Sequence, residues 1–149
     1  MDSSKASPNG VPVILGDRAQ ALAQYPHARK FGGLIYVSGI SSRRPDNTHV
    51  GVTIKGNGEV ILDITEQTRA VINNIRAILE SCGSGLKNVI DITVFLVDMK
   101  DYKKFNEVYN QYFEAETGPS RTTVAVHQLP HPNLLIEIKA VSADPAFLN

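Results

Sequence analysis

Arg121 and Glu137 are charged residues within segments that are otherwise apolar or β-branched. The guanidinium of Arg121 is a planar fork of donors that binds both oxygens of a carboxylate at once, which a lysine cannot do. The carboxylate of Glu137 can orient a water molecule, take a proton from it and pass a proton to a leaving group. Close together, these two side chains would support hydrolysis of a small carboxylic acid.

The segments that carry these residues read as two strands, 121–127 and 134–142, joined by a loop that contains prolines. If the strands pair as a hairpin, Thr123 lies opposite Glu137 or one pair away, and Arg121 becomes a neighbour of Glu137 on one face. The other face, which we expect to meet the helices, then receives the set Thr122, Val124, Val126, Leu134, Ile136, Ile138 and Ala140.

The polar face of these strands has two interpretations. In the first it is exposed, and Arg121, Glu137 and Lys139 form solvated cross-strand pairs. In the second another subunit covers the face and leaves a pocket. A neighbouring strand supports the second, because Val89, Phe95 and Val97 share a face with Asp91 and Thr93. A half-apolar face of that area is commonly buried in an oligomer. The residues alone leave both interpretations open.

The elements that must position these residues follow from local patterns. Asp63 and Glu66 match a capping box, and apolar residues then recur at helical spacing as far as Gly83. Residues 41–58 are rich in polar residues and glycine, and are expected to form a loop or lid. Further strands are predicted over 11–15, 34–39 and 89–97, and a second helix over 101–114. This order predicts an α+β fold, with two helices on one face of a mixed sheet.

Composition limits the possible partners. The chain has 149 residues, with 15 basic and 15 acidic side chains and a formal net charge of zero. Such a balance offers no broad attraction to nucleic acid or to an anionic membrane, so we expect neither as a partner. Residues 1–10 are expected to form a flexible N-terminal tail, and residues 11–149 a single domain. Cys82 is the only cysteine, and the chain starts without a hydrophobic signal region, so a cytoplasmic location is expected.

The histidines do not suggest a metal site. His127 and His131 are four residues apart, but Pro130 and Pro132 prevent the helix that would place them on one face. We therefore expect no metal, and no glycine loop or lysine suggests another cofactor. His27 either assists proton transfer or has a structural role in a turn.

Spaced motifs along most of the chain resemble the RidA/YjgF family. The resemblance runs from about Tyr25 to Ala143, and its motifs occur in the family's order at 25–39, 63–68, 94–99, 105–109, 118–124 and 136–138. It implies a chorismate-mutase-like fold assembled as a homotrimer, or as a higher assembly of trimers, with active sites in clefts between subunits. It also implies hydrolysis of enamine or imine acids to a 2-oxo acid and ammonia, without a cofactor.

The same resemblance implies roles for individual residues. Arg121 matches the arginine that binds the substrate carboxylate, and Glu137 matches the glutamate that holds the attacking water. Tyr25 matches a tyrosine at the rim of the pocket, and Gly39 and Asn106 match positions beside it.

The chain departs from the family's common pattern in three places, and two of the divergent segments resemble one branch of the family. Thr123 stands where many members have cysteine, and the segments 41–47 and 127–133 resemble 2-aminomuconate deaminases of aromatic-compound catabolism. A 2-aminomuconate substrate has a carboxylate at each end, so a second basic site is expected. Arg43 or Arg44, in a loop expected to be mobile, would clamp the far carboxylate; alternatively, both belong to a solvated turn.

Two other functions remain open. One is a general 2-iminobutanoate or 2-iminopropanoate deaminase that clears reactive imines. The other is a non-catalytic trimer that binds a ligand or RNA, although the zero net charge and the lack of a basic stripe argue against RNA.

Overall fold

Helix α1 (Ile64–Ser81) begins and packs as its sequence pattern predicts. In the computed structural model, which describes residues 6–148, the side chain of Asp63 caps the helix by accepting a hydrogen bond from the N–H of Glu66 at 3.1 Å. Gly83, just beyond the helix, has a φ of 76°, the left-handed conformation that commonly ends helices. The residues predicted to form the buried stripe are all buried: Ile64, Thr68, Val71, Ile72, Ile75, Ile78 and Leu79.

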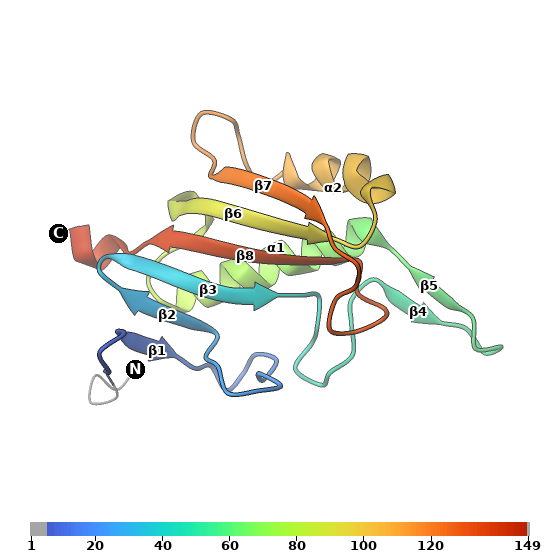
Figure 1. Cartoon of the computed structure of the whole chain (residues 1–149), viewed down its shortest axis with the longest axis horizontal. Helices are drawn as coiled ribbons and strands as arrows, with labels where there is room; N and C mark the ends of the chain where they lie inside the picture. Colours follow the sequence, from blue (N-terminus) through green and yellow to red (C-terminus); the bar gives the residue numbers. More distant parts are fainter. Residues whose placement is uncertain (1–5, 149) are drawn as a thin grey trace.

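The main sheet has six strands in the order β1-β2-β3-β8-β6-β7 (Figure 1). Only β6 and β7 pair in parallel, and the other neighbours are antiparallel. The sheet is therefore mixed, as predicted. Its strands are β1 (Val11–Val13), β2 (Ala28–Phe31), β3 (Leu34–Ile40), β6 (Val89–Leu96), β7 (Ser120–Ala125) and β8 (Ile136–Ala143).

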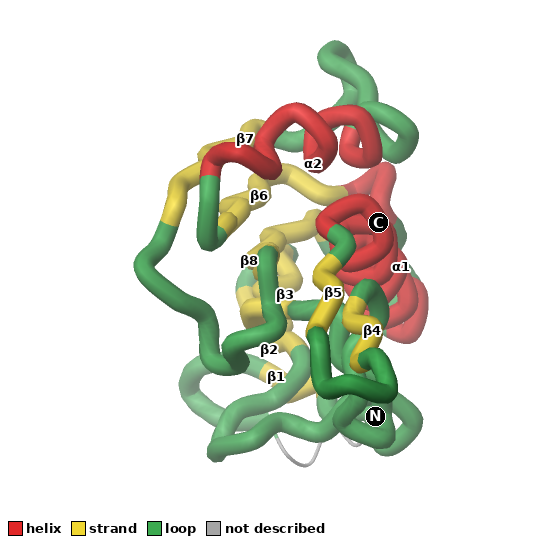
Figure 2. Tube along the Cα trace, turned by 90° about the vertical axis from the view of Figure 1, so that its right-hand side faces the viewer, coloured by secondary structure: helices red, strands yellow, loops and turns green. Residues whose placement is uncertain are grey.

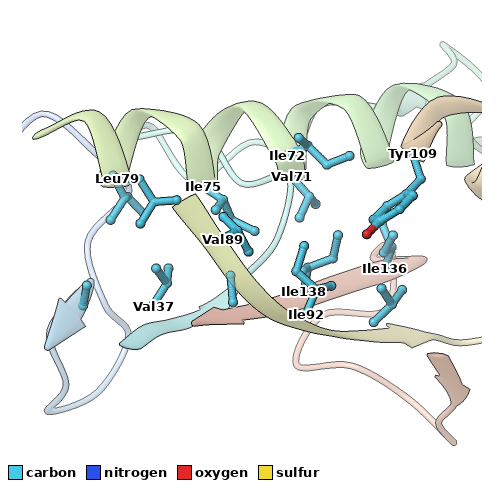
Figure 3. Close-up of a cluster of buried hydrophobic side chains, with 14 of the residues drawn as sticks. Val37, Val71, Ile72, Ile75, Leu79, Val89, Ile92, Tyr109, Ile136 and Ile138 are labelled. Atoms are coloured by element: carbon cyan, nitrogen blue, oxygen red, sulfur yellow. The ribbon is translucent and has the colours of Figure 1, made fainter. Parts of the chain in front are cut away.

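Both longer helices lie on one side of this sheet, which confirms the predicted α+β arrangement. Figure 2 shows α1 and α2 (Tyr102–Tyr109) to the right of and above the strands, with loops but no helix on the left. The hydrophobic core fills the space between α1 and the sheet, where Val71 and Ile75 approach Ile92 and Ile138 (Figure 3). Each such buried aliphatic side chain contributes about 1.5–3 kcal/mol to stability.

The last two long strands do not pair as a hairpin. β6 lies between them, and its Phe95 is opposite Val124 of β7 on one side and Glu137 of β8 on the other. The hairpin prediction was wrong because β6, α2 and β7 form a parallel crossover unit, a connection that takes about a dozen residues and usually contains a helix. β8 then pairs with the free side of β6.

The predicted faces of β7 are also reversed. Arg121 is opposite Ile92, which is buried in the core, so Arg121 and Thr123 point to the side of the helices. Thr122 and Val124 point to the other side, where Val124 is 39% exposed. On β8 the prediction is confirmed, since Leu134, Ile136, Ile138 and Ala140 are buried.

The segment predicted as loop over 41–58 contains one strand, β4 (Val52–Ile54), and a second unpredicted strand, β5 (Val60–Leu62), follows it. The two strands form a hairpin that projects from the body of the molecule (Figure 1). Helix α2 ends at Tyr109, earlier than predicted, and turns follow it. The remaining elements are short 3₁₀ helices: η2 (Leu86–Asn88), η3 (Met99–Asp101) and η4 (Pro145–Leu148).

The start of the chain is only partly described. Of the tail predicted over 1–10, residues 1–5 lie outside the described residues, while Ser7 and Gly10 form a bridge. Within 6–148, no helix combines the length and apolar character that crossing a bilayer requires.

Candidate active site

Glu137 lines a cavity of about 220 Å³. Three other residues predicted for the site line the same cavity: Tyr25, Gly39 and Arg43. They come from different parts of the chain, namely the segment before β2, the end of β3 and the loop that follows it. The fold thus brings half of the predicted site together without help from another chain.

Gly39 leaves room for the carboxylate of Glu137. A Cβ atom at this position would lie 3.0 Å from Cδ and 3.1 Å from Oε2 of Glu137. The pairing of β3 with β8 shifts register between Val37 and Ile40, and this irregularity brings the backbone of Gly39 against the acid. A residue without a side chain is required here by close approach rather than by an unusual φ.

The environment of Glu137 suits a general base. Burial raises the pKa of its carboxyl group above the ordinary value of 4.5. Within residues 6–148, no side chain or backbone group forms a hydrogen bond or ion pair with this carboxylate. Tyr25, 49% exposed, lines the same cavity. A raised pKa and an unpartnered carboxylate leave Glu137 able to accept a proton from water.

Sequence reasoning missed two polar residues in this cavity. Nη2 of Arg18 donates to Oδ1 of Asn74 at 2.6 Å, and Nδ2 of Asn74 donates to the carbonyl of Ser41 at 2.9 Å. Arg18 lies in an irregular segment with no periodicity to indicate its direction. Asn74 is at the margin of an amphipathic helix, where a polar residue carries no signal of its own.

The histidines near the cavity have structural contacts. Nδ1 of His27 accepts from the N–H of Leu15 at 3.1 Å, and its Nε2 lies 2.8 Å from the carbonyl of Ala19. Both ring nitrogens are therefore engaged, which favours the structural role. His131 stacks on His49, with ring centroids 4.4 Å apart. Among the described residues, no cluster of metal-binding side chains occurs.

Arg121 is held in a second polar cluster beside α2. Its Nη1 donates to Oδ1 of Asn106 at 2.9 Å, and its Nη2 donates to the hydroxyl of Tyr102 at 3.0 Å. Its Cζ lies 4.7 Å from the ring centroid of Tyr109, a cation–π distance. Burial raises the pKa of Tyr109, and Arg121 opposes that rise.

Thr123 belongs to the same cluster. It follows Arg121 on the same face of β7, and its Oγ1 is buried without a hydrogen-bond partner in the described part of the chain. Buried hydroxyl groups are rarely left unpaired, and each such group calls for an explanation. Arg121, Asn106 and Thr123 thus form a second cluster of predicted site residues, which we call the second half-site.

The two half-sites are separate within one chain. Arg121 and Glu137 lie on opposite faces of the sheet, with β6 between their strands. The prediction that they are neighbours in one chain was wrong, because it assumed that their two strands pair directly as a hairpin. Arg44 does not line the cavity; its Nη1 donates to Oγ1 of Thr48 at 3.1 Å, at the surface.

Comparison with known proteins identifies the class to which this fold and these residues belong. Residues 16–143 match the family model described as endoribonuclease L-PSP. The chain belongs to this family, the RidA/YjgF family, as its motifs predict.

Individual relatives cover nearly all of the domain. A RutC family protein of Pyrococcus abyssi is 40% identical over 131 residues, which are 87% of this chain and 94% of that protein. The crystal structure of yeast YEO7 is similar, with a TM-score of 0.77 and 35% identity, over 90% of this chain and 98% of that one. E. coli TdcF with bound serine has a TM-score of 0.72 and 27% identity, over 89% and 98% of the two chains.

Proposed function

We propose that this protein hydrolyses small enamine or imine acids to a 2-oxo acid and ammonia, at sites formed between copies of the chain. One copy contributes the Glu137 half-site, and its neighbour contributes the Arg121 half-site. The observation that carries the proposal is the carboxylate of Glu137, which faces a cavity. Its pKa is raised, and it has no protein partner among residues 6–148.

The second half-site supports the same activity. Arg121 keeps N–H donors that its bonds to Asn106 and Tyr102 do not use, and Thr123 has an unpaired buried hydroxyl. An acid group of the substrate could accept hydrogen bonds from these free donors of Arg121. E. coli TdcF, a structural relative, holds serine, a small molecule with a carboxylate and an amino group.

The open face of the sheet supports assembly. Tyr36 and Val124 lie on the side without helices and are 40% and 39% exposed. Phe95, beside Val124, adds to the apolar character of this face. A second copy that covers these side chains would remove apolar surface from water. We propose that this assembly is a homotrimer.

The proposed reaction uses both half-sites in one sequence. The enamine first tautomerises to the imine, while Arg121 holds the adjacent carboxylate and so fixes the position of the imine carbon. Glu137 takes a proton from water as the oxygen attacks that carbon. The protonated Glu137 returns this proton to the imine nitrogen, which gives a carbinolamine with a hydroxyl and an amino group on the same carbon. Glu137 then takes the hydroxyl proton and delivers it to the amino nitrogen, so that the C–N bond breaks, ammonia leaves and the C=O bond forms.

We further propose 2-aminomuconate as the substrate, within aromatic-compound catabolism. The segments 41–47 and 127–133 resemble that branch of the family, and both contribute to the cavity, through Arg43 and His131. The alternative substrates are 2-iminobutanoate and 2-iminopropanoate. Ammonia release from each substrate by the purified protein separates the two functions, and a faster rate with 2-iminobutanoate would contradict the 2-aminomuconate proposal.

Mixing two inactive variants tests whether each site spans two copies. Glu137→Gln and Arg121→Ala should each abolish ammonia release. When the two variants are unfolded, mixed and refolded together, random pairing should restore about a quarter of the activity, because some interfaces then combine an intact Glu137 with an intact Arg121. A mixture that stays inactive, although mass spectrometry shows mixed oligomers, would contradict the shared site.

The description of the family as endoribonuclease raises a second activity to be tested. The net charge of zero gives little attraction to a phosphate backbone. RNA cleavage that survives Glu137→Gln and Arg121→Ala would require a different site.

A further inference from the structure

We propose that Arg18 and Arg43 form an anion site in the wall of the Glu137 cavity, which receives a second carboxylate and so selects dicarboxylates. This inference rests on the proposed function, since it places the reacting end of the substrate beside Glu137. It replaces the predicted pair of Arg43 and Arg44, because Arg44 lies outside the cavity.

The charges around the cavity do not balance. Arg18 and Arg43 line it, whereas Glu137 is its only acidic lining residue among those that the structure describes. Within residues 6–148, neither guanidinium forms an ion pair, and the hydrogen bonds of both go to neutral oxygens. Two uncompensated cations at a cavity attract an anion.

Both guanidinium groups are oriented before any ligand arrives. Arg43 donates from Nη1 to Oδ1 of Asn47 at 2.6 Å and from Nη2 to the carbonyl of Gln20 at 2.5 Å. Arg18 is fixed by its bond to Asn74. In each case N–H donors remain for a carboxylate, and little side-chain entropy is left to lose on binding.

The loop that carries Arg43 is a bonded turn rather than a mobile lid. Its backbone forms a bridge from Arg43 to His49, and the fully buried Ser42 donates from Oγ to the carbonyl of Val50 at 2.9 Å. Asn47, at the tip, has a φ of 70°, which asparagine tolerates better than most residues. The loop expected to be mobile is thus tied by hydrogen bonds on both sides of Arg43, which orient this side chain.

His49 and His131 also line the cavity, with their rings tilted against each other. Burial lowers the pKa of His49, and the nearby His131, Arg43 and Arg44 lower it further. A lowered pKa favours the neutral imidazole, which offers no negative charge to pair with the guanidinium groups. An anion near Arg43 would relieve the same accumulation of charge.

Calorimetry with two unreactive acids tests the site. Muconate and sorbate share a six-carbon diene, but sorbate has one carboxylate and muconate has two. The unmodified protein should bind muconate more tightly. Arg43→Gln and Arg18→Gln should each weaken muconate binding about tenfold and leave sorbate binding nearly unchanged, because each removes charge from one carboxylate site only.

Arg44→Gln is the matched control and should change neither affinity. Unchanged binding of sorbate shows that a variant has kept its cavity. The inference is overturned if the unmodified protein binds the two acids equally, or if Arg43→Gln behaves like Arg44→Gln.

These outcomes are separate from those of the deaminase test, because binding of unreactive acids requires no turnover. A protein that prefers muconate through Arg43 but releases no ammonia would refute only the proposed reaction. A protein that deaminates its substrate but binds both acids equally would refute only the anion site.

Discussion

The contact between Gly39 and Glu137 is a residue-scale feature that predicts a specific effect on activity. Gly39→Ala would place a methyl group 3.0 Å from Cδ of Glu137 and displace the carboxylate by a few tenths of an ångström or more. Small displacements of a reacting group cost up to about 100-fold in rate. We expect ammonia release to fall by about tenfold to 100-fold, with little change in the melting temperature.

Gly56→Ala is the control for this substitution. No atom lies within 4 Å of a Cβ built at Gly56, so its activity should remain unchanged. Equal activity of the two alanine variants would show that the carboxylate does not need the space that Gly39 leaves.

Glu137 also makes stability depend on pH. Since its pKa is raised in the folded protein, the folded state gains stability below the ordinary value of 4.5 and loses it as pH rises through the raised pKa. Glu137→Gln removes the cost of the partly buried negative charge. We expect this variant to be more stable than the unmodified protein at pH 7, and to show little gain at pH 4.

Urea unfolding at pH 4 and pH 7 measures this difference. A stability gain of the same size at both pH values would contradict a raised pKa. A raised pKa predicts that the gain is larger at pH 7, where the substitution removes a buried negative charge, than at pH 4, where it replaces a neutral acid by a neutral amide. Loss of activity in the same variant at all pH values is expected in either case.

At the scale of elements, local sequence patterns predicted features that depend on nearby residues. They failed to predict which strands pair, because pairing joins residues far apart in the sequence. The cap at Asp63 and the buried stripe of α1 depend on residues near each other in sequence, and both were predicted correctly. The position of β7 depends on the crossover through α2, which no local pattern records. The faces of β7 were reversed because Asn106 and Tyr102 give polar partners to Arg121 on the side of the helices.

Helix α2 therefore has a role that its apolar stripe did not predict, because it orients Arg121. Tyr102→Phe removes the hydroxyl that accepts from Nη2 of Arg121 and keeps the aromatic ring. Loss of one hydrogen bond to a charged group should raise KM about three- to tenfold and change kcat less.

Tyr112→Phe provides the matched control. The hydroxyl of Tyr112 bonds to Asn73 at 3.4 Å, away from Arg121, and its loss should leave KM unchanged. If the two phenylalanine variants have the same KM, the bond from Tyr102 does not position Arg121 for the substrate.

At the scale of the whole molecule, the residues predicted from the sequence as one site do not all come together within one chain. Tyr25, Gly39, Arg43 and Glu137 share a cavity, whereas Arg121 and its neighbours lie beyond the sheet. The family resemblance supplied the possibility that two copies contribute. The alternation of residues along a strand cannot indicate a second copy, because it shows which side chains share a face and not what covers that face.

The open face of the sheet offers a test of assembly and activity together. Val124 lies on this face at the edge strand β7 and is 39% exposed, so Val124→Asp leaves the core of one chain intact. A charge at an apolar contact between copies must be desolvated without a partner, which should disrupt the assembly. We expect the variant to keep its circular dichroism, to elute as a smaller species in size-exclusion chromatography with light scattering, and to lose ammonia release.

Ile54→Asp, on the projecting hairpin where Ile54 is 68% exposed, should retain both assembly and activity. A Val124→Asp protein that is monomeric yet fully active would show that one chain suffices, and the half-sites on opposite faces of the sheet would then need separate explanations.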